Sequence, residues 1–407
     1  MWFENLMVVL GAMALLVRFG YALYGTGLAR SKNAAGAVLR NVCDLCLASL
    51  AFWFIGYALY QQDHNGILGL NPRLIAAWAN EADSPLFFTT VVILIGTGIV
   101  NGIIGERAKF GAACFASIVL AGLVLPITAH WTWLGWLRQM GMVDVAGASA
   151  LHVAAGAFAA IGAFLAGPRS GKYNRDGSSN AIPGHSVPLA SAGVVAVLIG
   201  WIPYIAGCTL HFGMRGFVAG LPDTPASNVL FAAAAGGFVS LLYGQLRYGK
   251  PEVYLTFGGL LGALVAISAA GGAVSTPAAV AIGAIAGFVV PLATVLIDLW
   301  WKIDDPTGGI AIHLVGGIWG MLATAIFFPV PFANRLKLLG TQALGILAIA
   351  GLSVVIAFAL FGTLRAMGRL RANEADEYDG LDLAEHDLNA YPDFQQTMIK
   401  SYHLREA

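Results

Sequence analysis

Two aspartate–histidine pairs share one spacing in this chain of 407 residues. Asp144 precedes His152 by eight residues, and Asp305 precedes His313 by eight residues. The residues that follow the histidines are also similar, with Val-Ala-Ala-Gly after the first and Leu-Val-Gly-Gly after the second. A neutral imidazole, whose unperturbed pKa is about 6.5, can hydrogen-bond a small ligand and relay a proton. The two pairs therefore predict one site made from two copies of a motif.

Both pairs lie in a chain that is too apolar for a soluble protein. Apolar residues make up 58% of it and charged residues 11%, whereas soluble domains have about 25% charged residues. This composition excludes a soluble enzyme, a disordered chain and a secreted disulfide scaffold. A net charge of zero gives no field that would attract nucleic acid. The four cysteines have no metal-ligand spacing, so no metal site is expected.

Helices that cross a membrane need about 20 mostly apolar residues, and eleven runs of that kind occur. They are centred near residues 5–28, 42–60, 85–105, 110–129, 144–166, 187–207, 228–246, 253–271, 277–300, 309–329 and 338–364. We predict an all-α polytopic membrane protein with eleven transmembrane helices, arranged as two inverted five-helix repeats and a final helix. Residues 1–364 form the expected transmembrane domain, and residues 365–407 form an acidic tail.

Lysines and arginines predict the orientation because they gather in cytoplasmic connections. Of the 22, sixteen fall in one set of connections, five in the opposite set, and Arg18 in the first run. The N-terminus is therefore expected outside and the tail in the cytoplasm, in a cell inner (plasma) membrane. The first run lacks a basic leader and is too long for a signal peptide, so we interpret it as a retained helix.

The repeat predicts where the histidines lie. Blocks of five helices have opposite orientations in the membrane, and inverted repeats of this kind typify transporters with a site near the midplane. Eight helical residues rise about 12 Å, so His152 and His313 approach the middle of a core about 30 Å thick from opposite sides. A single membrane histidine is more often satisfied by a neighbouring helix, but the matched pair favours a functional site. We expect both rings to face one apolar pore, within hydrogen-bond reach of each other.

The aspartates have a structural interpretation as well. A carboxylate just before a helix caps the first turn and interacts with the helix dipole. We expect this role for Asp305. For Asp144 we expect it at least in part, so that this residue shapes a site near the outer surface more than it touches a ligand.

Further short motifs occur in order along the chain. They are Gly-Leu-Ala-Arg-Ser-Lys-Asn (27–33), Gly-Ile-Ile-Gly-Glu-Arg-Ala-Lys-Phe (102–110), His-Trp-Thr-Trp (130–133), Asp-Val-Ala-Gly with His152 (144–152), Gly-Trp (200–201), Asp-Asp-Pro with His-Leu-Val-Gly-Gly-Ile-Trp-Gly (304–320), and Gly-Leu-Asp-Leu-Ala-Glu-His (380–386). With these motifs the chain resembles the Amt/Rh ammonium transporter family, on the Amt side, over nearly its whole length. Residues 1–364 would then be an Amt-type channel domain.

The resemblance implies a homotrimer in membrane lipid, each subunit having its own narrow pore. Ammonium is the implied ligand: it is recruited at an outer vestibule and deprotonated, and ammonia and a proton then pass the twin histidines. The resemblance implies neither enzyme activity nor a cofactor. Trp133 matches the vestibule tryptophan, whose indole face attracts ammonium by a cation–π contact. Asp144 belongs to the same recruitment region, and Trp201 matches a tryptophan that lines the pore.

The chain departs from the family pattern at the outer gate. Ile93 and Tyr204 stand where the family has two gate phenylalanines, and Cys208 replaces a serine that helps to hold the cation. A thiol is a much weaker hydrogen-bonding group than a hydroxyl. We therefore expect weak or slow ammonium flux, and we expect Tyr204 to tolerate phenylalanine. Arg18 in the first run is also unusual, and it either pairs with Asp44 or extends toward the membrane surface.

The tail is expected to lie against the cytoplasmic pore mouths, with its acidic residues facing basic loops. These loops contain Arg107, Lys109, Arg169 and Lys172. After Tyr391 the chain is expected to be helical from Pro392 onward. Such an extension could lead to a fused signalling domain, and a P-II-type regulator is the other partner to consider at this face.

Three function classes stay open. The principal hypothesis is ammonium transport, which the intact twin histidines favour. An ammonium sensor or transducer with little conduction is the alternative, favoured by the rebuilt gate, Cys208 and the extended tail. A membrane haem protein would use paired histidines from the set His130, His152, His211 and His313, and it would make the repeated aspartate spacing a coincidence.

Overall fold

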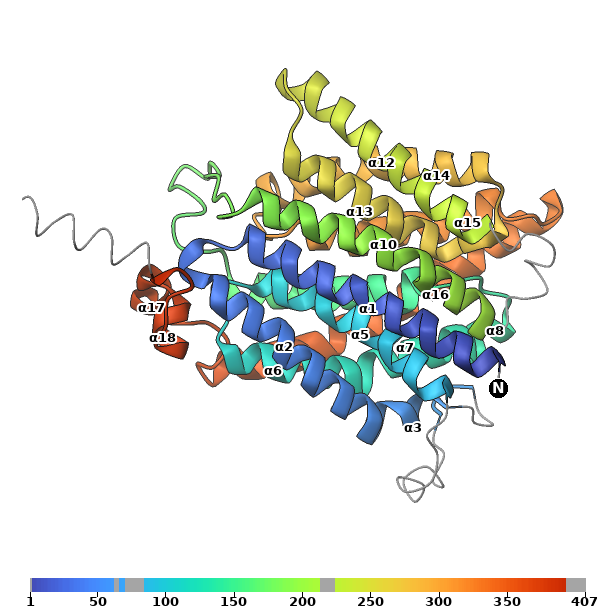
Figure 1. The fold of residues 1–407 in the computed structure, drawn as a ribbon, viewed down its shortest axis with the longest axis horizontal. Helices are drawn as coiled ribbons and strands as arrows, with labels where there is room; N and C mark the ends of the chain where they lie inside the picture. The colour runs from blue at the N-terminus through green and yellow to red at the C-terminus, as the bar shows by residue number, and fades with distance from the viewer. Residues whose placement is uncertain (1, 62–65, 70–83, 213–223, 393–407) are drawn as a thin grey trace, which may run out of the picture.

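The computed structural model describes residues 2–61, 66–69, 84–212 and 224–392, and its fold is drawn in Figure 1. Within these residues, eleven helical segments are long and apolar enough to cross a membrane. The prediction of eleven transmembrane helices is therefore confirmed. No β-strand occurs among the described residues, where only two isolated bridges are found.

The first repeat of helices runs from the N-terminus to residue 166. Its elements are α1 (Trp2–Leu28), a short 3-10 turn (Ser31–Asn33), α2 (Ala34–Ala51), a π-helical turn (Phe52–Gly56), α3 (Tyr57–Tyr60), α5 (Ser84–Ile104), α6 (Phe110–Val119), a second π-helical turn (Leu120–Val124), α7 (Leu125–Trp133), α8 (Trp136–Gln139), η4 (Ala148–Val153) and α9 (Ala154–Ala166). The second segment starts at Ser31, well before the expected 42–60, because Arg40 and Asn41 look polar in the sequence but are buried against other elements.

The second repeat and the tail follow. Their elements are α10 (Val187–His211), α12 (Thr224–Tyr248), α13 (Val253–Ala270) with a 3-10 turn (Gly271–Ala273), α14 (Thr276–Leu299), η6 (Ile310–Val315), α15 (Gly316–Phe327), α16 (Phe332–Ala366), α17 (Glu374–Asp379) and α18 (Leu381–His386). The expected helix beyond Pro392 lies outside the described residues.

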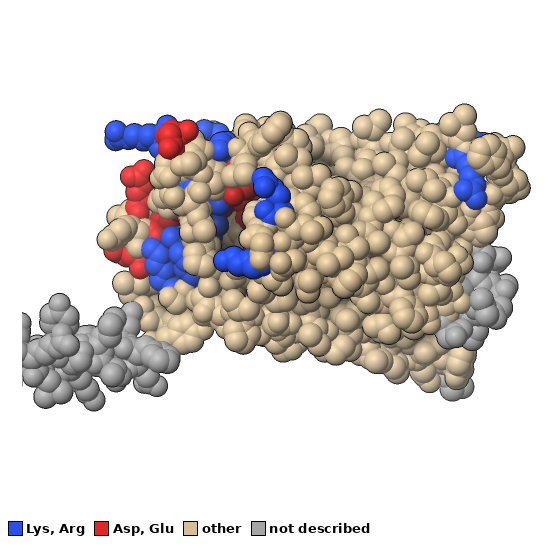
Figure 2. Space-filling model, turned by 90° about the horizontal axis from the view of Figure 1, so that it is seen from above, with Lys and Arg blue, Asp and Glu red and all other residues tan. Residues whose placement is uncertain are grey.

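The bundle has two ends that differ in charge. The N-terminus lies at one end and α17 and α18 at the other (Figure 1), so we name these the N-terminal face and the tail face. Figure 2 shows most of the visible charged residues at the tail face, and a broad uncharged band between the two ends. Large apolar side chains are exposed on α12, α14 and α16, including Phe238, Phe288 and Leu347. This surface suits contact with lipid or with other apolar helices rather than with water.

Small residues bring the central helices together. Helices α1 and α10 cross where Gly20 faces Gly193, and a Cβ on Gly20 would lie 2.6 Å from the carbonyl oxygen of Gly193. Close backbone approach of this kind replaces the hydrophobic driving force that is missing between helices in lipid. The contact holds α1 beside α10, which between them carry several of the aromatic residues described below.

The tail is built into the tail face through two acidic residues of α18. Asp382 accepts hydrogen bonds from the backbone N–H groups of Ala35 (2.9 Å) and Gly36 (2.7 Å), so it caps the start of α2 from outside that helix. Glu385 pairs with Arg40 at 3.0 Å and accepts a hydrogen bond from the backbone N–H of Phe110 at 2.7 Å.

The acidic tail contacts the expected loops through their backbone, as Glu377 does at the N–H of Ser170 (2.7 Å), and not through their basic side chains. Glu377 pairs with Arg371 at 2.8 Å, within the same tail. Lys109 donates to the carbonyl oxygen of Gly368, and Lys172 pairs with Asp298 at 3.1 Å. Charge patterning alone did not reveal that Arg169 and Lys172 have carboxylate partners outside the tail, or that Arg107 and Lys109 donate to backbone carbonyl oxygens.

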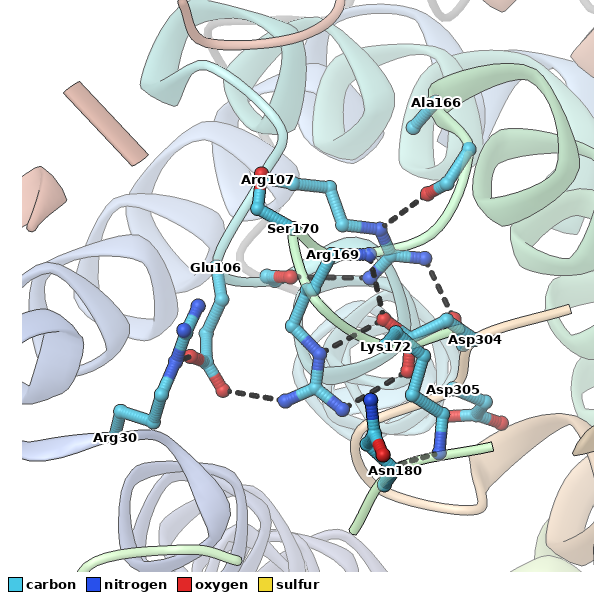
Figure 3. A network of polar contacts seen from close by, with 12 residues as sticks. Arg30, Glu106, Arg107, Ala166, Arg169, Ser170, Lys172, Asn180, Asp304 and Asp305 are labelled. Atoms are coloured by element: carbon cyan, nitrogen blue, oxygen red, sulfur yellow. Dashed lines mark hydrogen bonds and ion pairs between the residues drawn. The ribbon is translucent and has the colours of Figure 1, made fainter. Parts of the chain in front are cut away.

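Arg107 and Arg169 belong to a separate buried network, drawn in Figure 3. Arg169 contacts Asp304 through Nε (2.8 Å) and Nη2 (2.9 Å), and it contacts Glu106 through Nη1 (2.9 Å). Arg107 donates to the carbonyl oxygen of Asp304 at 2.6 Å, and Arg30 pairs with Glu106. The network joins the loops after α1, α5, α9 and α14, so it fixes the tail-face ends of both repeats.

This network predicts acid lability. Burial raises the pKa of Asp304, but the hydrogen bonds and charge of Arg169 outweigh it and hold this pKa at about 2. Because this value is below that of an unfolded aspartate, Asp304 stabilises the fold above about pH 4 and loses that effect as the pH falls toward 2. We expect a loss of about 2 kcal/mol, measured as the thermal unfolding midpoint of detergent-solubilised protein across this range. Asp304→Asn should make the unfolding midpoint less dependent on pH. The same pH dependence in the native chain and in Asp304→Asn would contradict this assignment.

Candidate functional site

Both repeat histidines lie on π-helical turns. His152 is on η4 and His313 on η6, and each turn continues as an α-helix, α9 and α15 respectively. π-Helical turns are rare and occur often at functional sites, because the extra residue per turn redirects side chains. Each turn begins a few residues after the repeat aspartate, so the sequence motif corresponds to one local structure that occurs twice.

Asp144 caps its turn with both carboxylate oxygens. Its Oδ1 accepts from the backbone N–H of Ala148 (2.8 Å), and its Oδ2 accepts from the backbone N–H groups of Ser149 (2.8 Å) and Ala150 (3.2 Å) and from Ser149 Oγ (2.7 Å). Burial raises the pKa of Asp144, and these hydrogen bonds oppose the shift. Its carbonyl oxygen accepts from Trp133 Nε1 at 2.8 Å. The residue thus links the start of η4 to Trp133.

Asp305 makes the matching contacts in the second repeat. Its Oδ2 accepts from the backbone N–H of Ile310 (2.7 Å), and its Oδ1 accepts from the N–H and the hydroxyl of Thr307 (both 3.1 Å). Burial raises the pKa of this carboxyl as well. These are the contacts of a carboxylate that satisfies the unpaired N–H groups at a helix start.

The two histidines meet inside a buried column of rings. Their ring centroids are 5.2 Å apart, with 16° between the planes. Trp201 lies parallel to His152 at 5.4 Å, and Tyr21 meets His313 edge-on at 5.6 Å. Ser268 fixes the tryptophan by accepting from its Nε1 at 3.0 Å. Residues from α1, α10, η4 and η6 thus form one continuous column, in which three rings are stacked and Tyr21 closes one end edge-on.

Several ring nitrogens of the pair have no partner. Both nitrogens of His152 and Nδ1 of His313 are buried and make no hydrogen bond. No hydrogen bond joins the two rings directly, and their centroid separation of 5.2 Å is consistent with the expected reach through one bridging molecule. Buried polar groups are normally paired, so these nitrogens are suited to a ligand that passes or stays between the rings.

A small cavity continues from His313 toward the tail face. It offers about 30 Å³ and is lined by His313, Tyr21, Asn41, Gly98 and Thr307, among others. That space suffices for one or two molecules the size of water or ammonia. Beside it, Tyr24 donates to the carbonyl oxygen of Thr307 at 3.0 Å, which ties α1 to the loop that leads into η6.

On the N-terminal side the column is closed. Ile93, Tyr204 and Cys208 are all fully buried. Tyr204 meets Trp201 edge-on at 5.4 Å, and its hydroxyl donates to the carbonyl oxygen of Ala146. The expectation that Tyr204 tolerates phenylalanine overlooked this hydrogen bond, because periodicity and family matching do not show what a buried hydroxyl contacts.

Phe212 covers one face of the Trp133 indole. Its ring lies parallel to Trp133 at 3.8 Å, with 7° between the planes. Arg138 holds the pair together by donating to the carbonyl oxygens of Trp133 (2.9 Å) and Phe212 (2.8 Å). Phe212 was not among the predicted site residues, although it follows Cys208 by four residues and caps the end of α10 on the same side. A cation–π site on this indole face requires Phe212 to move.

The remaining histidines of the haem hypothesis lie apart from the column. His130 Nδ1 contacts the carbonyl oxygen of Tyr60 at 2.9 Å, and His211 Nε2 contacts Thr89 Oγ1 at 3.2 Å. No group of three or more possible metal ligands occurs in the part of the chain that the structure describes. The haem hypothesis thus lacks support from the other two histidines.

Comparison with known proteins gives a consistent result. The model of the Ammonium Transporter Family matches residues 5–391. Ammonium transporter Amt2 of Archaeoglobus fulgidus is 33% identical over 95% of this chain and 87% of its own length. Ammonium transporter 3 of Dictyostelium discoideum is 28% identical over 93% of this chain and 91% of its own length.

Solved structures with the same fold are also known. A sensor Amt protein superposes with a TM-score of 0.87 at 32% identity, over 94% of this chain and 98% of that chain. Mep2 of Candida albicans superposes with a TM-score of 0.78 over 92% of this chain and 87% of that chain. At 24% identity the second similarity concerns the fold alone.

Proposed function

The chain belongs to the ammonium transporter family, and from this premise we propose that it moves ammonium across a membrane through the His152–His313 column. The family is one of transporters and not of enzymes. The observation that carries the proposal is the pair of parallel, buried imidazoles 5.2 Å apart, with unpartnered nitrogens and a cavity beyond them. We infer further that the N-terminal face is outside and the tail face cytoplasmic, as the excess of basic residues on one set of loops favours.

Deprotonation explains why histidines suit this path. Moving an ammonium-sized cation into a low-dielectric interior costs on the order of 20 kcal/mol in an idealised estimate. Transfer of the proton to an imidazole removes most of that barrier, because neutral ammonia has no comparable charge to desolvate. His152 and His313 would accept hydrogen bonds from ammonia and pass the proton between them, while Trp201 and Tyr21 exclude water from the sides of the column. Ammonia then enters the cavity beside His313.

Recruitment is proposed for the vestibule at the N-terminal face. Trp133 offers an indole for a cation–π contact, and Asp144 positions it through a backbone hydrogen bond. Cys208 holds the cation more weakly than the serine that the family resemblance implies, and Ile93 with Tyr204 forms the gate in place of two phenylalanines. A homotrimer would cover part of the apolar surface of α12, α14 and α16 and leave the rest to lipid.

An ammonium sensor with little conduction is the second candidate. Two observations favour it: the similarity to a sensor Amt protein at a TM-score of 0.87, and the closed vestibule in which Phe212 stacks on Trp133. In this case binding near Trp133 would be transmitted to the tail, which contacts the start of α2 through Asp382. A fused signalling domain or a P-II-type regulator would then respond at the tail face.

Ammonium-evoked currents on supported membranes test transport directly. A transporter gives a saturable transient with ammonium and none with potassium at the same ionic strength. A sensor gives binding, seen as a change in tryptophan fluorescence, without a transient. Equal signals from ammonium and potassium would contradict both candidates, since neither then distinguishes the ligand from another monovalent cation.

Removing the ring that covers Trp133 should strengthen recruitment. We expect Phe212→Ala to increase ammonium binding or the transient roughly threefold to tenfold, because an exposed indole gains a cation–π contact of about 1 kcal/mol. The measurement is the half-saturating ammonium concentration. Trp131→Phe serves as the control, since Trp131 lies elsewhere and donates to the carbonyl oxygen of Ile67 at 2.7 Å. An unchanged or higher half-saturating concentration in Phe212→Ala would remove this face of Trp133 from the site.

A further inference from the structure

The cavity beside His313 has a neighbour that leads toward the tail. A second space of about 30 Å³, which we name the branch cavity, lies between α1, α2 and α5. Four residues line both spaces, so the two adjoin: they are Gly25, Asn41, Gly102 and Thr307. Leu381 of α18 lines the branch cavity as well. One or two molecules the size of water or ammonia fit in this volume, between the proposed path and the tail helix.

Gly25 of α1 leaves room where the two cavities meet. A Cβ built on this residue would meet no atom within 4 Å outside its own stretch of helix. A glycine inside a helix costs about 1 kcal/mol relative to alanine. A side chain at this position would therefore favour the helix, but it would fill the junction between the two cavities.

Two buried polar atoms of the branch cavity have no hydrogen-bond partner among the described residues. They are Nη1 of Arg40 and Oδ1 of Asn41, and both residues line the cavity. Arg40 Nη2 donates to the carbonyl oxygen of Ala108 (2.7 Å) and pairs with Glu385 (3.0 Å), and Asn41 Nδ2 donates to the carbonyl oxygen of Ala37 (2.9 Å). Because buried polar groups are normally paired, the remaining donor and acceptor suit one small molecule that accepts from Arg40 and donates to Asn41.

The chemistry of these two atoms favours a neutral molecule over a cation. Ammonium and potassium have no lone pair with which to accept a hydrogen bond from Arg40. Glu106, which also lines the cavity, already accepts from Arg169 (2.9 Å), Asn33 (2.9 Å) and Arg30. Ammonia has both a lone pair and N–H donors, so it can satisfy Arg40 and Asn41 together. Water has the same capacities, but the branch cavity adjoins the cavity into which ammonia is proposed to pass.

A buried ion pair fixes the helices around the branch cavity. Arg18 of α1 pairs with Asp44 of α2 at 2.6 Å, rather than extending toward the membrane surface, and it donates to the carbonyl oxygen of Asn41 at 3.4 Å. Thr97 of α5 donates to Asp44 at 2.9 Å, and the guanidinium lies against Gly98, where a Cβ would overlap Nη1. The pair thus joins α1, α2 and α5 near Asn41, so the cavity lies between helices that are held in place.

Residues of the branch cavity also hold the tail. Arg40 pairs with Glu385 of α18, and Asn33 Oδ1 accepts from the backbone N–H of Leu381 at 2.8 Å. Both Arg40 and Asn33 line the cavity. A molecule bound to Arg40 Nη1 would therefore contact the same guanidinium that holds the tail helix through Nη2.

We infer that the branch cavity is a second ligand site, which binds one molecule of ammonia between Arg40 and Asn41 and thereby strengthens the docking of α18. The inference rests on the proposed function only for the supply of ammonia from the His313 cavity. Ammonia in this site orients the guanidinium that pairs with Glu385. A ligand that binds the docked tail better than the undocked tail shifts the equilibrium toward the docked state.

Hydrogen exchange at the backbone amides of α18 measures this docking. The detergent-solubilised native chain is compared in ammonium chloride and in potassium chloride of equal ionic strength, at about pH 7 and about pH 8. We expect exchange to be about threefold to tenfold slower in ammonium, which is the effect of one net hydrogen bond. The half-maximal concentration of total ammonium should fall about tenfold at the higher pH, because ammonia is the deprotonated form and its fraction rises with pH.

Two variants remove the site in different ways. Gly25→Leu fills the junction and should abolish the response to ammonium. Asn41→Leu replaces the acceptor with an apolar side chain of similar size, and it should do the same if Gly25→Leu does not fold. Gly351→Leu on α16 is the matched control, because a Cβ there also meets no atom within 4 Å but the residue is exposed on the outside of the bundle. It should keep the native response.

The outcomes separate this inference from the proposed function. A native response in folded Gly25→Leu or Asn41→Leu would overturn the inference, since ammonium would then act on the tail from another place. The same half-maximal concentration at both pH values would overturn it too, because the bound species would be the cation. An ammonium-evoked current without any change in exchange would leave transport standing and refute the branch site. The expected change in exchange without a current would support the branch site and refute transport.

Discussion

Alanine in place of His152 or His313 should reduce the ammonium-evoked current at least about a hundredfold, the range that a positioned acid–base group contributes to proton transfer. Each substitution removes a proton acceptor from the column and breaks the stack between Trp201 and Tyr21. The cation then faces the apolar path without losing its proton. Current on supported membranes at saturating ammonium measures the effect.

His185 provides the matched control for this prediction. It lies at the tail face, where its Nδ1 contacts the carbonyl oxygen of Ala29 at 2.9 Å and its Nε2 contacts Tyr391 at 2.6 Å. His185→Ala removes an imidazole outside the column and should leave most of the current. Currents near the native value in His152→Ala would mean that the column does not carry the proton.

Asp144→Ala should destabilise the protein by about 3 kcal/mol, because it leaves three buried backbone N–H groups and the hydroxyl of Ser149 without their acceptor. Asp144→Asn keeps one oxygen, which can serve Ser149 and Ala150, but it turns an NH2 group toward the N–H of Ala148. We therefore expect Asp144→Asn to lose roughly half as much stability as Asp144→Ala. Thermal unfolding midpoints in detergent measure the loss of stability. Ammonium binding by the same samples measures the effect on the site.

Asp176 is the control for that series. It caps a local turn by accepting from the N–H and the hydroxyl of Ser178 at 2.9 Å and 2.7 Å, but it is exposed. Asp176→Ala should therefore change the midpoint very little. If Asp144→Asn lost as much stability and binding as Asp144→Ala, the charge of Asp144 would matter more than its capping contacts.

The sequence was sufficient for the fold because lipid imposes strong constraints. Hydrophobic runs of spanning length follow from the need to satisfy every backbone group internally, and their number was correct. The Asp–His spacing led to His152 and His313 because the repeat places equivalent residues at equivalent depths. The rise of an α-helix per residue was enough to place both histidines near the middle of the membrane. The two rings are indeed neighbours in the structure.

Contacts between side chains of distant helices were less predictable. Neither the stacking of Phe212 on Trp133 nor the hydroxyl contact of Tyr204 follows from helical periodicity. The π-helical turns were also missed, since they depend on the cap contacts of Asp144 and Asp305 and not on local propensity. Arg18 could be recognised as unusual, but its partner was decided by the space at Gly98, which only the packing of three helices defines.

The most direct test of the account is ammonium flux into proteoliposomes that contain the native chain, followed with an internal pH dye and compared with His152→Ala. We predict a saturable response that is slower than that of an ordinary member of the family, because the vestibule is closed by Phe212 and Cys208 replaces a serine. The response should fall to the level of protein-free liposomes in His152→Ala. A native response no greater than that of protein-free liposomes, in a sample that still binds ammonium, would contradict transport through the histidine column and favour the sensor.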